Sequence, residues 1–245
     1  MLITLAGPIG SGKTVLTGIL AEDLGALAVY EPVDDNPVID DFYRGNAIAD
    51  ARRAAGEADA RNPYAFLMQV YLLNRRFAAI KRARERERET GQDTILDRSI
   101  YEDRVFMGMN HDRGNVSEVE WETYNALFAN MMEDLEGAPY RKSPDLMVLI
   151  RVSFGTMMRH IRKRGRPFEQ PEVDPGLEDY YRDLLRHYDQ WEQEYDASPL
   201  LVIDGDHEDF EGKPADRAEV VARVRAALGR PIDPEQAMGG VDARP

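Results

Sequence analysis

One short stretch near the start of the chain constrains its fold more than any other: Gly7-Pro8-Ile9-Gly10-Ser11-Gly12-Lys13-Thr14. It follows the apolar run Met1–Ala6, which predicts a buried strand, and it precedes apolar residues at helical spacing up to Gly25. The pattern G-x-x-x-x-G-K-[ST] between a strand and a helix is a phosphate-binding P-loop in the context that it requires. A glycine-rich turn without a ligand is the alternative, and the complete pattern disfavours it. The sequence therefore predicts a nucleotide site.

The motif also predicts the role of its residues. Glycines let backbone N–H groups turn inward around phosphate oxygens, at a helix N-terminus where the macrodipole favours an anion. Lys13 would reach the β- and γ-phosphates, and the Thr14 hydroxyl would bind Mg²⁺. The residues predicted to hold the nucleotide phosphates are Gly7, Ile9, Gly10, Ser11, Gly12, Lys13 and Thr14.

Composition narrows the class of protein. The chain has 245 residues and a formal charge of −14, from 31 basic and 45 acidic side chains. Such a surface argues against general nucleic-acid or anionic-membrane binding. There is no cysteine, which excludes disulfides and thiolate metal sites. The sequence begins directly with a strand, and no apolar run approaches the ~18 residues of a membrane span, so we expect a cytoplasmic protein without membrane or nucleic-acid partners.

The other predicted strands are 26–30, 94–96, 145–152 and 200–203, and an acidic residue follows three of them: Glu31, Asp97 and Asp204. In an open parallel sheet, ligands bind beyond the carboxyl ends of the strands. Glu31 stands at one such end, where its carboxylate could take a proton from an attacking hydroxyl or could simply bind a helix N-terminus. Asp97 stands at another, where P-loop enzymes commonly place a carboxylate on the Mg²⁺ side.

A long helix is predicted from Asn62-Pro63. Its apolar stripe comprises Phe66, Val70, Leu73, Phe77 and Ile80. Gln69 and Arg76 lie seven residues apart and therefore share one face, which we place off the core stripe. They are either a paired amide and guanidinium or two surface residues. The segment before this helix, residues 45–61, predicts a solvated helix or a mobile insertion without chemistry.

The segment 159–166 carries five cationic side chains in a chain that is otherwise acidic. They are Arg159, Arg162, Lys163, Arg164 and Arg166, with His160 among them. A helix dipole accounts for one or two such charges at a C-terminus. Arginines that close over transferring phosphates would account for all of them. After a last predicted helix the chain has little to bury, so we expect one domain over residues 1–228 and a disordered tail over 229–245.

These pieces occur together, in order, in one known family. The chain resembles the deoxynucleoside kinases, particularly the bacterial deoxyadenosine/deoxyguanosine kinases. The resemblance is carried by Gly7–Thr14, Glu31-Pro32-Val33, Phe66–Phe77 around Gln69, Asp97-Arg98-Ser99, and Arg164-Gly165-Arg166 with Glu169. It spans about Met1 to Phe210 and implies an α/β P-loop kinase fold: a three-layer sandwich whose five-stranded parallel sheet has helices on both faces, with an arginine-rich lid. It also implies a homodimer.

The implied reaction is transfer of the γ-phosphoryl group of ATP to the 5′-hydroxyl of a deoxynucleoside, with Mg²⁺. By resemblance, Glu31 is the general base and Arg98 holds the 5′-oxygen and the phosphate, while Thr14 and Asp97 serve the metal. The remaining roles are base reading by Gln69, Arg76 and Asp103, binding of the sugar 3′-hydroxyl by Tyr43 and Glu169, and lid closure by Arg164 and Arg166.

Two positions depart from the family pattern. Asp97 stands where animal relatives carry Glu, although bacterial members share the Asp. His160 stands where many relatives carry a further lid arginine, so we assign it no catalytic role; Arg159 or Arg162 could substitute.

Two other functions compete with this interpretation. A nucleoside-monophosphate kinase of the thymidylate type would need extra cations near Glu31, where the sequence has Asp34, Asp35, Asp40 and Asp41 instead. A non-catalytic nucleotide-binding protein would not need every expected catalytic position filled. The Gln69, Arg76 and Asp103 set predicts a purine deoxynucleoside as best substrate, deoxycytidine as tolerated and thymidine as poor.

Overall fold

The computed structural model describes residues 1–31, 35–136 and 143–230. Its centre is a parallel sheet with the strand order β2-β3-β1-β4-β5. The strands are β1 (Leu2–Ala6), β2 (Leu27–Val29), β3 (Thr94–Asp97), β4 (Leu146–Arg151) and β5 (Leu200–Asp204). All five lie within about two residues of the runs predicted from the sequence, and the predicted fold class is confirmed.

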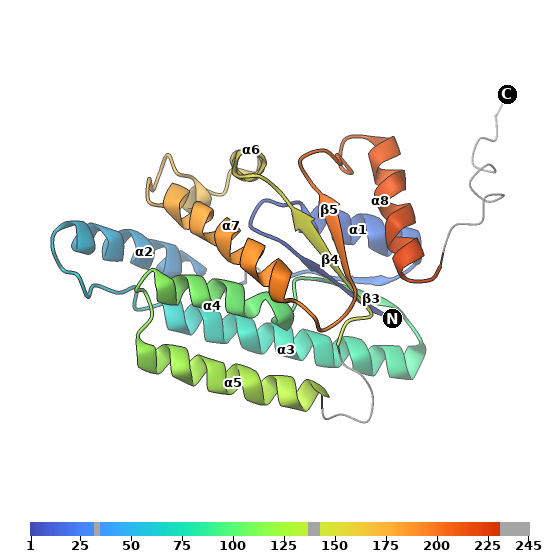
Figure 1. The fold of residues 1–245 in the computed structure, drawn as a ribbon, viewed down its shortest axis with the longest axis horizontal. Coiled ribbons are helices and arrows are strands. Elements are labelled where there is room, and N and C mark those ends of the chain that lie inside the picture. Colours follow the sequence, from blue (N-terminus) through green and yellow to red (C-terminus); the bar gives the residue numbers. More distant parts are fainter. Residues whose placement is uncertain (32–34, 137–142, 231–245) are drawn as a thin grey trace.

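Helices cover the sheet on both faces (Figure 1). The helices are α1 (Lys13–Leu24), α2 (Ile39–Ala54), α3 (Ala65–Thr90), α4 (Asp103–Asp112), α5 (Glu118–Glu136), α6 (Phe154–Arg164), α7 (Leu177–Glu194) and α8 (Pro214–Ala227), with short 3₁₀ turns η1 (Ile100–Glu102) and η2 (Pro167–Glu169). Helices α1 and α8 lie on one side and α3 and α4 on the other, with α5 packed outside α3.

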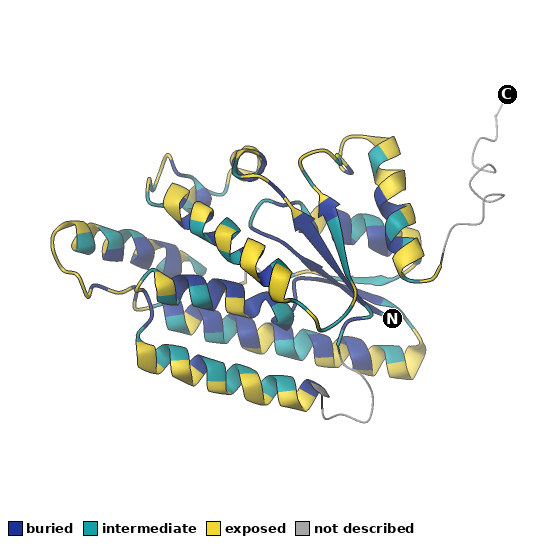
Figure 2. Ribbon diagram, viewed as in Figure 1, coloured by how far each residue is buried: buried dark blue, intermediate teal, exposed yellow. Residues whose placement is uncertain are grey.

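The core lies where the sheet is covered from both sides (Figure 2). Every residue of β1 and β3 is buried, as are the first five residues of β4. A strand buried on both faces cannot alternate polar and apolar residues, which explains the continuous apolar runs in the sequence. The rigid strands carry their loops to one edge of the sheet, and that edge holds the candidate site.

The buried face of α3 differs from the predicted stripe. Gln69 and Arg76 are 2% and 5% exposed and lie on the buried face, whereas Phe66, Val70 and Phe77 are only partly buried. The placement of the amide and guanidinium off the core was therefore wrong. Arg76 is stabilised there by Glu31 and Asp103, which come from distant parts of the chain.

The prediction for residues 45–61 was partly wrong as well. Helix α2 occupies most of this segment, but it is not solvated on all sides, since Gly45, Asn46 and Ala49 are buried. Asn62 Nδ2 donates to Asn46 Oδ1 at 2.7 Å and to Phe42 O at 2.8 Å. These bonds fix α2 against the start of α3.

Two further predictions concern the C-terminal tail and the absence of membrane-spanning segments. Of the expected tail, Gly229 and Arg230 are described, and Arg230 bonds Asp93; residues 231–245 lie outside the described residues. None of the helices in the described ranges is long and apolar enough to cross a membrane.

Candidate active site

A cavity of about 1320 Å³ lies at the carboxyl edge of the sheet. It gathers almost all of the predicted site residues, although they come from the P-loop, the ends of β2 and β3, helices α2 and α3, and the lid. Those that line the cavity are Ile9, Gly10, Ser11, Gly12, Lys13, Thr14, Glu31, Tyr43, Gln69, Arg76, Asp97, Arg98, Arg164, Arg166 and Glu169. The sequence prediction thus describes one contiguous site.

The P-loop forms the floor of this cavity. Gly12 caps α1 with φ 98°, and no side chain of the described residues bonds the first N–H groups of the helix. Those unsatisfied donors, together with the helix dipole, favour an anion. At Gly7, with φ 145°, a Cβ would lie 2.7 Å from Ile150 O. Only glycine therefore lets the loop turn this closely over β4.

Lys13 is folded back onto the loop. Its Nζ donates to Gly7 O at 2.9 Å and to Pro8 O at 2.8 Å. Burial and, to a smaller extent, the neighbouring Arg98 lower the pKa of Lys13 to about 7, against the opposing effect of nearby carboxylates. An ammonium group that is poorly stabilised without a ligand is well suited to a polyanion.

Thr14 and Asp97 meet across the start of α1. The Thr14 hydroxyl donates to Asp97 Oδ2 at 2.6 Å. A hydroxyl and one carboxylate are a typical protein contribution to a Mg²⁺ site, whose remaining ligands are waters and substrate phosphates. The two predicted metal residues therefore fit the ion.

Glu31 lies between two arginines. Its Oε1 accepts from Arg76 Nε at 2.8 Å, and its Oε2 lies 3.2 Å from Arg98 Nε. Burial alone would raise the pKa of Glu31, but Arg76, Arg98 and the bond from Arg76 outweigh it and hold this pKa below its usual value. The carboxylate is therefore ionised and held in place at neutral pH.

Of the three base-reading candidates, Arg76 is the one that contacts Glu31 in the described residues. Gln69 and Arg76 line the cavity, whereas Asp103, fully buried, is not among its described lining residues and bonds Arg76 Nη1 from behind. Gln69 Oε1 and Asp103 Oδ2 have no hydrogen-bond partner among the described residues. Burial raises the pKa of Asp103 to about 7, although Arg76 acts in the opposite direction. One guanidinium thus contacts both Glu31 and Asp103.

The two sugar-binding candidates lie near one another under the lid. The Tyr43 ring lies 5.1 Å from that of Phe168, next to Glu169 in sequence. Burial raises the pKa of Tyr43, and nearby Glu169 acts in the same direction. Both side chains line the cavity, as the resemblance implies for a 3′-hydroxyl site.

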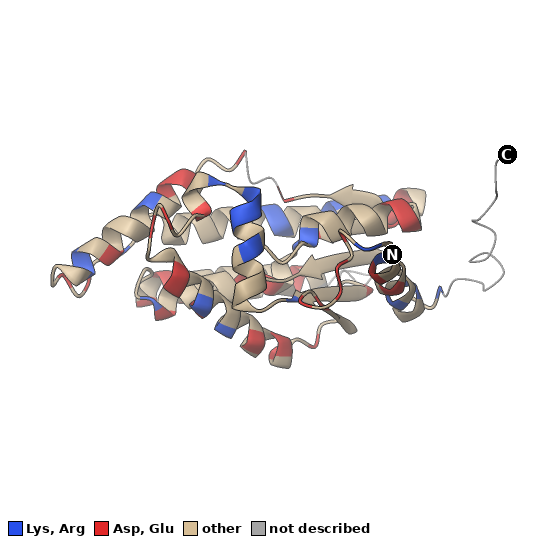
Figure 3. Cartoon of the chain, turned by 90° about the horizontal axis from the view of Figure 1, so that it is seen from above, with Lys and Arg blue, Asp and Glu red and all other residues tan. Residues whose placement is uncertain are grey.

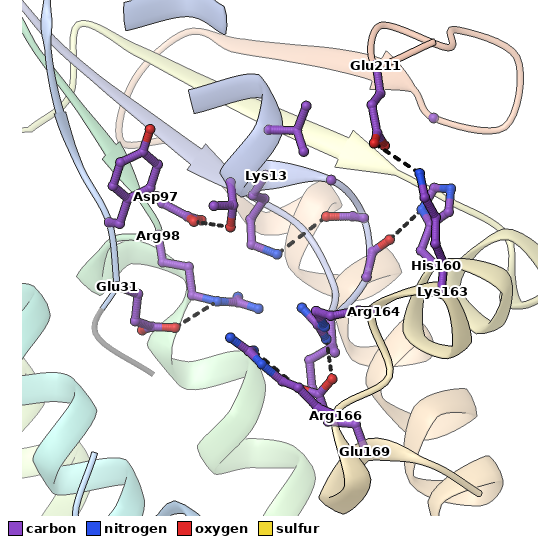
Figure 4. A pocket seen from close by; sticks show the side chains of 18 of the residues that line it. Lys13, Glu31, Asp97, Arg98, His160, Lys163, Arg164, Arg166, Glu169 and Glu211 are labelled. Carbon is purple, nitrogen blue, oxygen red and sulfur yellow. Dashed lines mark hydrogen bonds and ion pairs between the residues drawn. The ribbon is translucent and has the colours of Figure 1, made fainter. Parts of the chain in front are cut away.

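The predicted lid is the basic segment 159–166 at the end of helix α6, and most of its residues line the cavity. In Figure 3 the positions of Lys and Arg are blue, and several of them lie along the ribbon of α6. Arg164 bonds Glu169, and Arg166 Nη1 lies 3.6 Å from the same carboxylate. Lys163 bonds Glu211 at 3.0 Å across the cavity (Figure 4). Carboxylates of the chain itself therefore balance part of a charge that we had expected to require a bound anion.

The two remaining arginines of segment 159–166 differ in whether they line the cavity. Arg159 lines the cavity, whereas Arg162 bonds Glu172 at 2.9 Å and is not among the described lining residues. Of the two suggested substitutes for a missing lid arginine, only Arg159 is therefore placed for that role. His160 Nδ1 lies 2.7 Å from Gly10 O, so the lid contacts the P-loop directly.

Sequence reasoning missed two groups of residues. Phe42, Met68, Leu72, Phe106 and Tyr180 give the cavity its apolar wall. The second group, Glu102 and Tyr188, lies behind Arg98. Nothing in the local pattern distinguishes Tyr188 from its helix stripe, and Glu102 is specified by Gly7 and Tyr188, which are remote in sequence.

The fold and the cavity define a P-loop phosphotransferase with a second, partly apolar pocket beside its phosphate site. The family model for deoxynucleoside kinases matches residues 3–228. The chain is 48% identical to a deoxyguanosine kinase of Lactobacillus acidophilus, over 91% of this chain and 89% of the relative. It is 44% identical to a deoxyadenosine kinase of the same organism, over 93% and 96%.

Solved structures agree with these relatives. A deoxyadenosine kinase of M. mycoides with bound dATP matches with a TM-score of 0.70 and 26% identity, over 92% of this chain and 100% of that one. The same protein with dCMP and dCDP matches with a TM-score of 0.71. The chain belongs to the deoxynucleoside kinase family, and it is a kinase.

Proposed function

We propose that this kinase transfers the γ-phosphoryl group of ATP to the 5′-hydroxyl of a purine deoxynucleoside. The observation that carries the proposal is that Gln69 and Arg76 line the same cavity as the P-loop and Glu31, with Arg76 bonded to Glu31. A base read by Gln69 and Arg76 would bring its sugar hydroxyl toward Glu31 and the phosphates. The deoxyguanosine and deoxyadenosine kinases that resemble the chain support the purine assignment.

The proposed roles follow from the geometry. Glu31 takes the proton of the 5′-hydroxyl as its oxygen bonds to the γ-phosphorus, and the bond from that phosphorus to the β-bridging oxygen breaks to release ADP. Lys13, Arg98 and the lid arginines Arg164 and Arg166 would stabilise the charge on the transferring group. Tyr43 and Glu169 would hold the 3′-hydroxyl. Mg²⁺, held by Thr14 and Asp97, would neutralise phosphate charge when bound.

The phosphorylation of a nucleoside monophosphate is not favoured. Such an acceptor would bring its own phosphate to the region of Glu31, where Asp35 lines the cavity; Asp34 lies outside the described residues. Arg76 and Arg98 are the cations nearest Glu31, and both already face carboxylates.

The first expected result concerns base preference. Deoxyadenosine or deoxyguanosine should give the highest kcat/KM, deoxycytidine a lower one, and thymidine the lowest. Thymine lacks an exocyclic amine and would leave buried polar groups unpaired, which makes such discrimination large. A panel of the four deoxynucleosides with ATP and Mg²⁺ measures this directly. A highest kcat/KM for thymidine would refute the proposed reading of the pocket.

The same panel on the double variant Arg76→Met/Asp103→Ala should show a smaller or reversed gap against thymidine. The ratio of kcat/KM values is the quantity to compare, since a loss common to all substrates cancels in it. Arg104→Met, at an exposed position next in sequence, is the matched control and should keep the wild-type ratios.

We also propose a cytoplasmic homodimer. Helices α3 and α5 pack together and expose apolar side chains, with Leu67 52% and Val119 72% exposed. Sedimentation velocity should give about twice the chain mass of 27.8 kDa. A monomer at micromolar concentration would contradict this part of the proposal.

A further inference from the structure

A fully buried carboxylate lies behind the cavity, and the roles proposed above do not use it. Glu102 is the last residue of η1 and is 0% exposed. A buried charge is costly unless it is paired and hydrogen-bonded. Its partners therefore indicate why the chain places an acid here.

Those partners come from three other parts of the chain. Glu102 Oε2 accepts from the backbone N–H of Gly7 at 3.2 Å and from the Tyr188 hydroxyl at 2.6 Å. Glu102 Oε1 lies 3.2 Å from Arg98 Nη1. One carboxylate thus contacts the first P-loop residue, helix α7 and the arginine that follows β3.

Arg98 is constrained from several sides at once. It has φ 80°, and it is the one described non-glycine residue with positive φ, a conformation that persists only where the surroundings impose it. Its Nη1 also donates to Gly7 O at 3.2 Å and to the Tyr188 hydroxyl at 2.9 Å. Its guanidinium carbon lies 4.9 Å from the centre of the Phe106 ring.

We propose that Glu102, together with Tyr188, is a positioning residue that holds the Arg98 guanidinium and the P-loop at Gly7 in one fixed arrangement. The P-loop binds the phosphoryl donor, and Arg98 faces the acceptor side of the cavity. Because Glu102 contacts both, it would fix the position of the P-loop relative to Arg98. Phosphoryl transfer depends on such positioning, because small displacements of stabilising groups are costly to the rate.

This inference rests on the role proposed for Arg98, so the experiment tests the two separately. The variants are Arg98→Gln, Glu102→Gln and their combination. Glutamine at 102 keeps the shape and an acceptor for Gly7 N–H, but it lacks the charge that faces Arg98. Steady-state kcat and both KM values are measured for deoxynucleoside and ATP, with circular dichroism to verify the fold.

We expect Glu102→Gln to lower kcat by ~10–100-fold, the range found for residues that orient a functional group through hydrogen bonds. Both KM values should change little. Because Glu102 acts through Arg98, the double variant should have the kcat of Arg98→Gln alone rather than the product of the two losses. A merely structural role would give multiplicative losses.

Tyr188→Phe gives a second, milder test if Glu102→Gln does not fold. It removes the hydroxyl that bridges Glu102 and Arg98, and it should lower kcat by a smaller factor that again disappears in the Arg98→Gln background. Tyr195→Phe, just beyond the end of the same helix, is the matched control; it loses one hydroxyl bond, to Ser198, and should keep wild-type kinetics.

Three results would overturn the inference: wild-type kcat in Glu102→Gln, a loss confined to KM, or multiplicative losses in the double variant. In each of these cases a low kcat for Arg98→Gln would leave the role of Arg98 standing. A wild-type kcat for Arg98→Gln would instead refute that role, and the positioning inference with it.

Discussion

Replacing Glu31 with glutamine is expected to lower kcat by ~10²–10⁴-fold, the usual contribution of a general base, and to change deoxynucleoside affinity little. The amide keeps the shape of the carboxylate but cannot accept the proton of the 5′-hydroxyl. The fold should survive, because Arg76 keeps its ion pair with Asp103 and Arg98 keeps Glu102. Single-turnover rates and equilibrium binding measure the two effects separately.

The low pKa of Glu31 also predicts how the reaction rate depends on pH. Because Arg76 and Arg98 hold this pKa below its usual 4.5, the active carboxylate is present above that pH and is lost only as the pH falls further. The rate should therefore show no acid limb from Glu31 near neutral pH. Glu178→Gln, an exposed position on α7, is the control. A near-normal kcat for Glu31→Gln would rule out the general-base role.

Replacing Lys13 with methionine should lower kcat by ~10²–10³-fold, the typical cost of removing one preorganised donor from a transition-state site. The free protein should not lose stability, since burial opposes the charged ammonium in the absence of a nucleotide. Lys81→Met, with a half-exposed side chain on α3, is the control and should behave as wild type.

Lys13 also predicts how nucleotide affinity varies with pH. In the free enzyme its pKa of about 7 means that the ammonium loses its proton as the pH rises through neutrality. Bound phosphates favour the charged form, so above that pH binding takes up a proton and ATP affinity falls by up to about tenfold per pH unit. Calorimetry at roughly pH 8 in two buffers of different ionisation enthalpy measures this uptake. Uptake that persists in Lys13→Met would exclude Lys13 as its source.

The sequence alone was sufficient to predict the features that depend on a local pattern of residues. The P-loop follows from eight consecutive residues, and the strands from apolar runs that only a doubly covered parallel sheet explains. The position of Asp97 next to the P-loop could be predicted because a strand end fixes where it lies. Its bond to Thr14 joins two residues that are 83 positions apart in the chain.

Polar residues inside the structure could not be found in this way. Periodicity counts Gln69 and Arg76 as polar and therefore as external, but both are buried. Arg76 is stabilised there because Asp103 and Glu31 pair with it from other elements. Glu102 was missed for the same reason, since its partners Gly7 and Tyr188 are remote in sequence. A buried polar group is specified by tertiary partners rather than by its neighbours in the chain.

The double contact of Arg76 with Glu31 and Asp103 has a consequence for how this enzyme can change its substrate range. If Arg76 reads the base and Glu31 is the general base, as proposed, a mutation at Arg76 that admits a new base also removes a cation from Glu31, so selectivity and turnover cannot be altered independently there. Gln69 lines the same wall and has no bond to Glu31 among the described contacts. Directed evolution toward nucleoside analogues should therefore accumulate its first tolerated changes at Gln69, with Arg76 replaced only after compensating changes around Glu31.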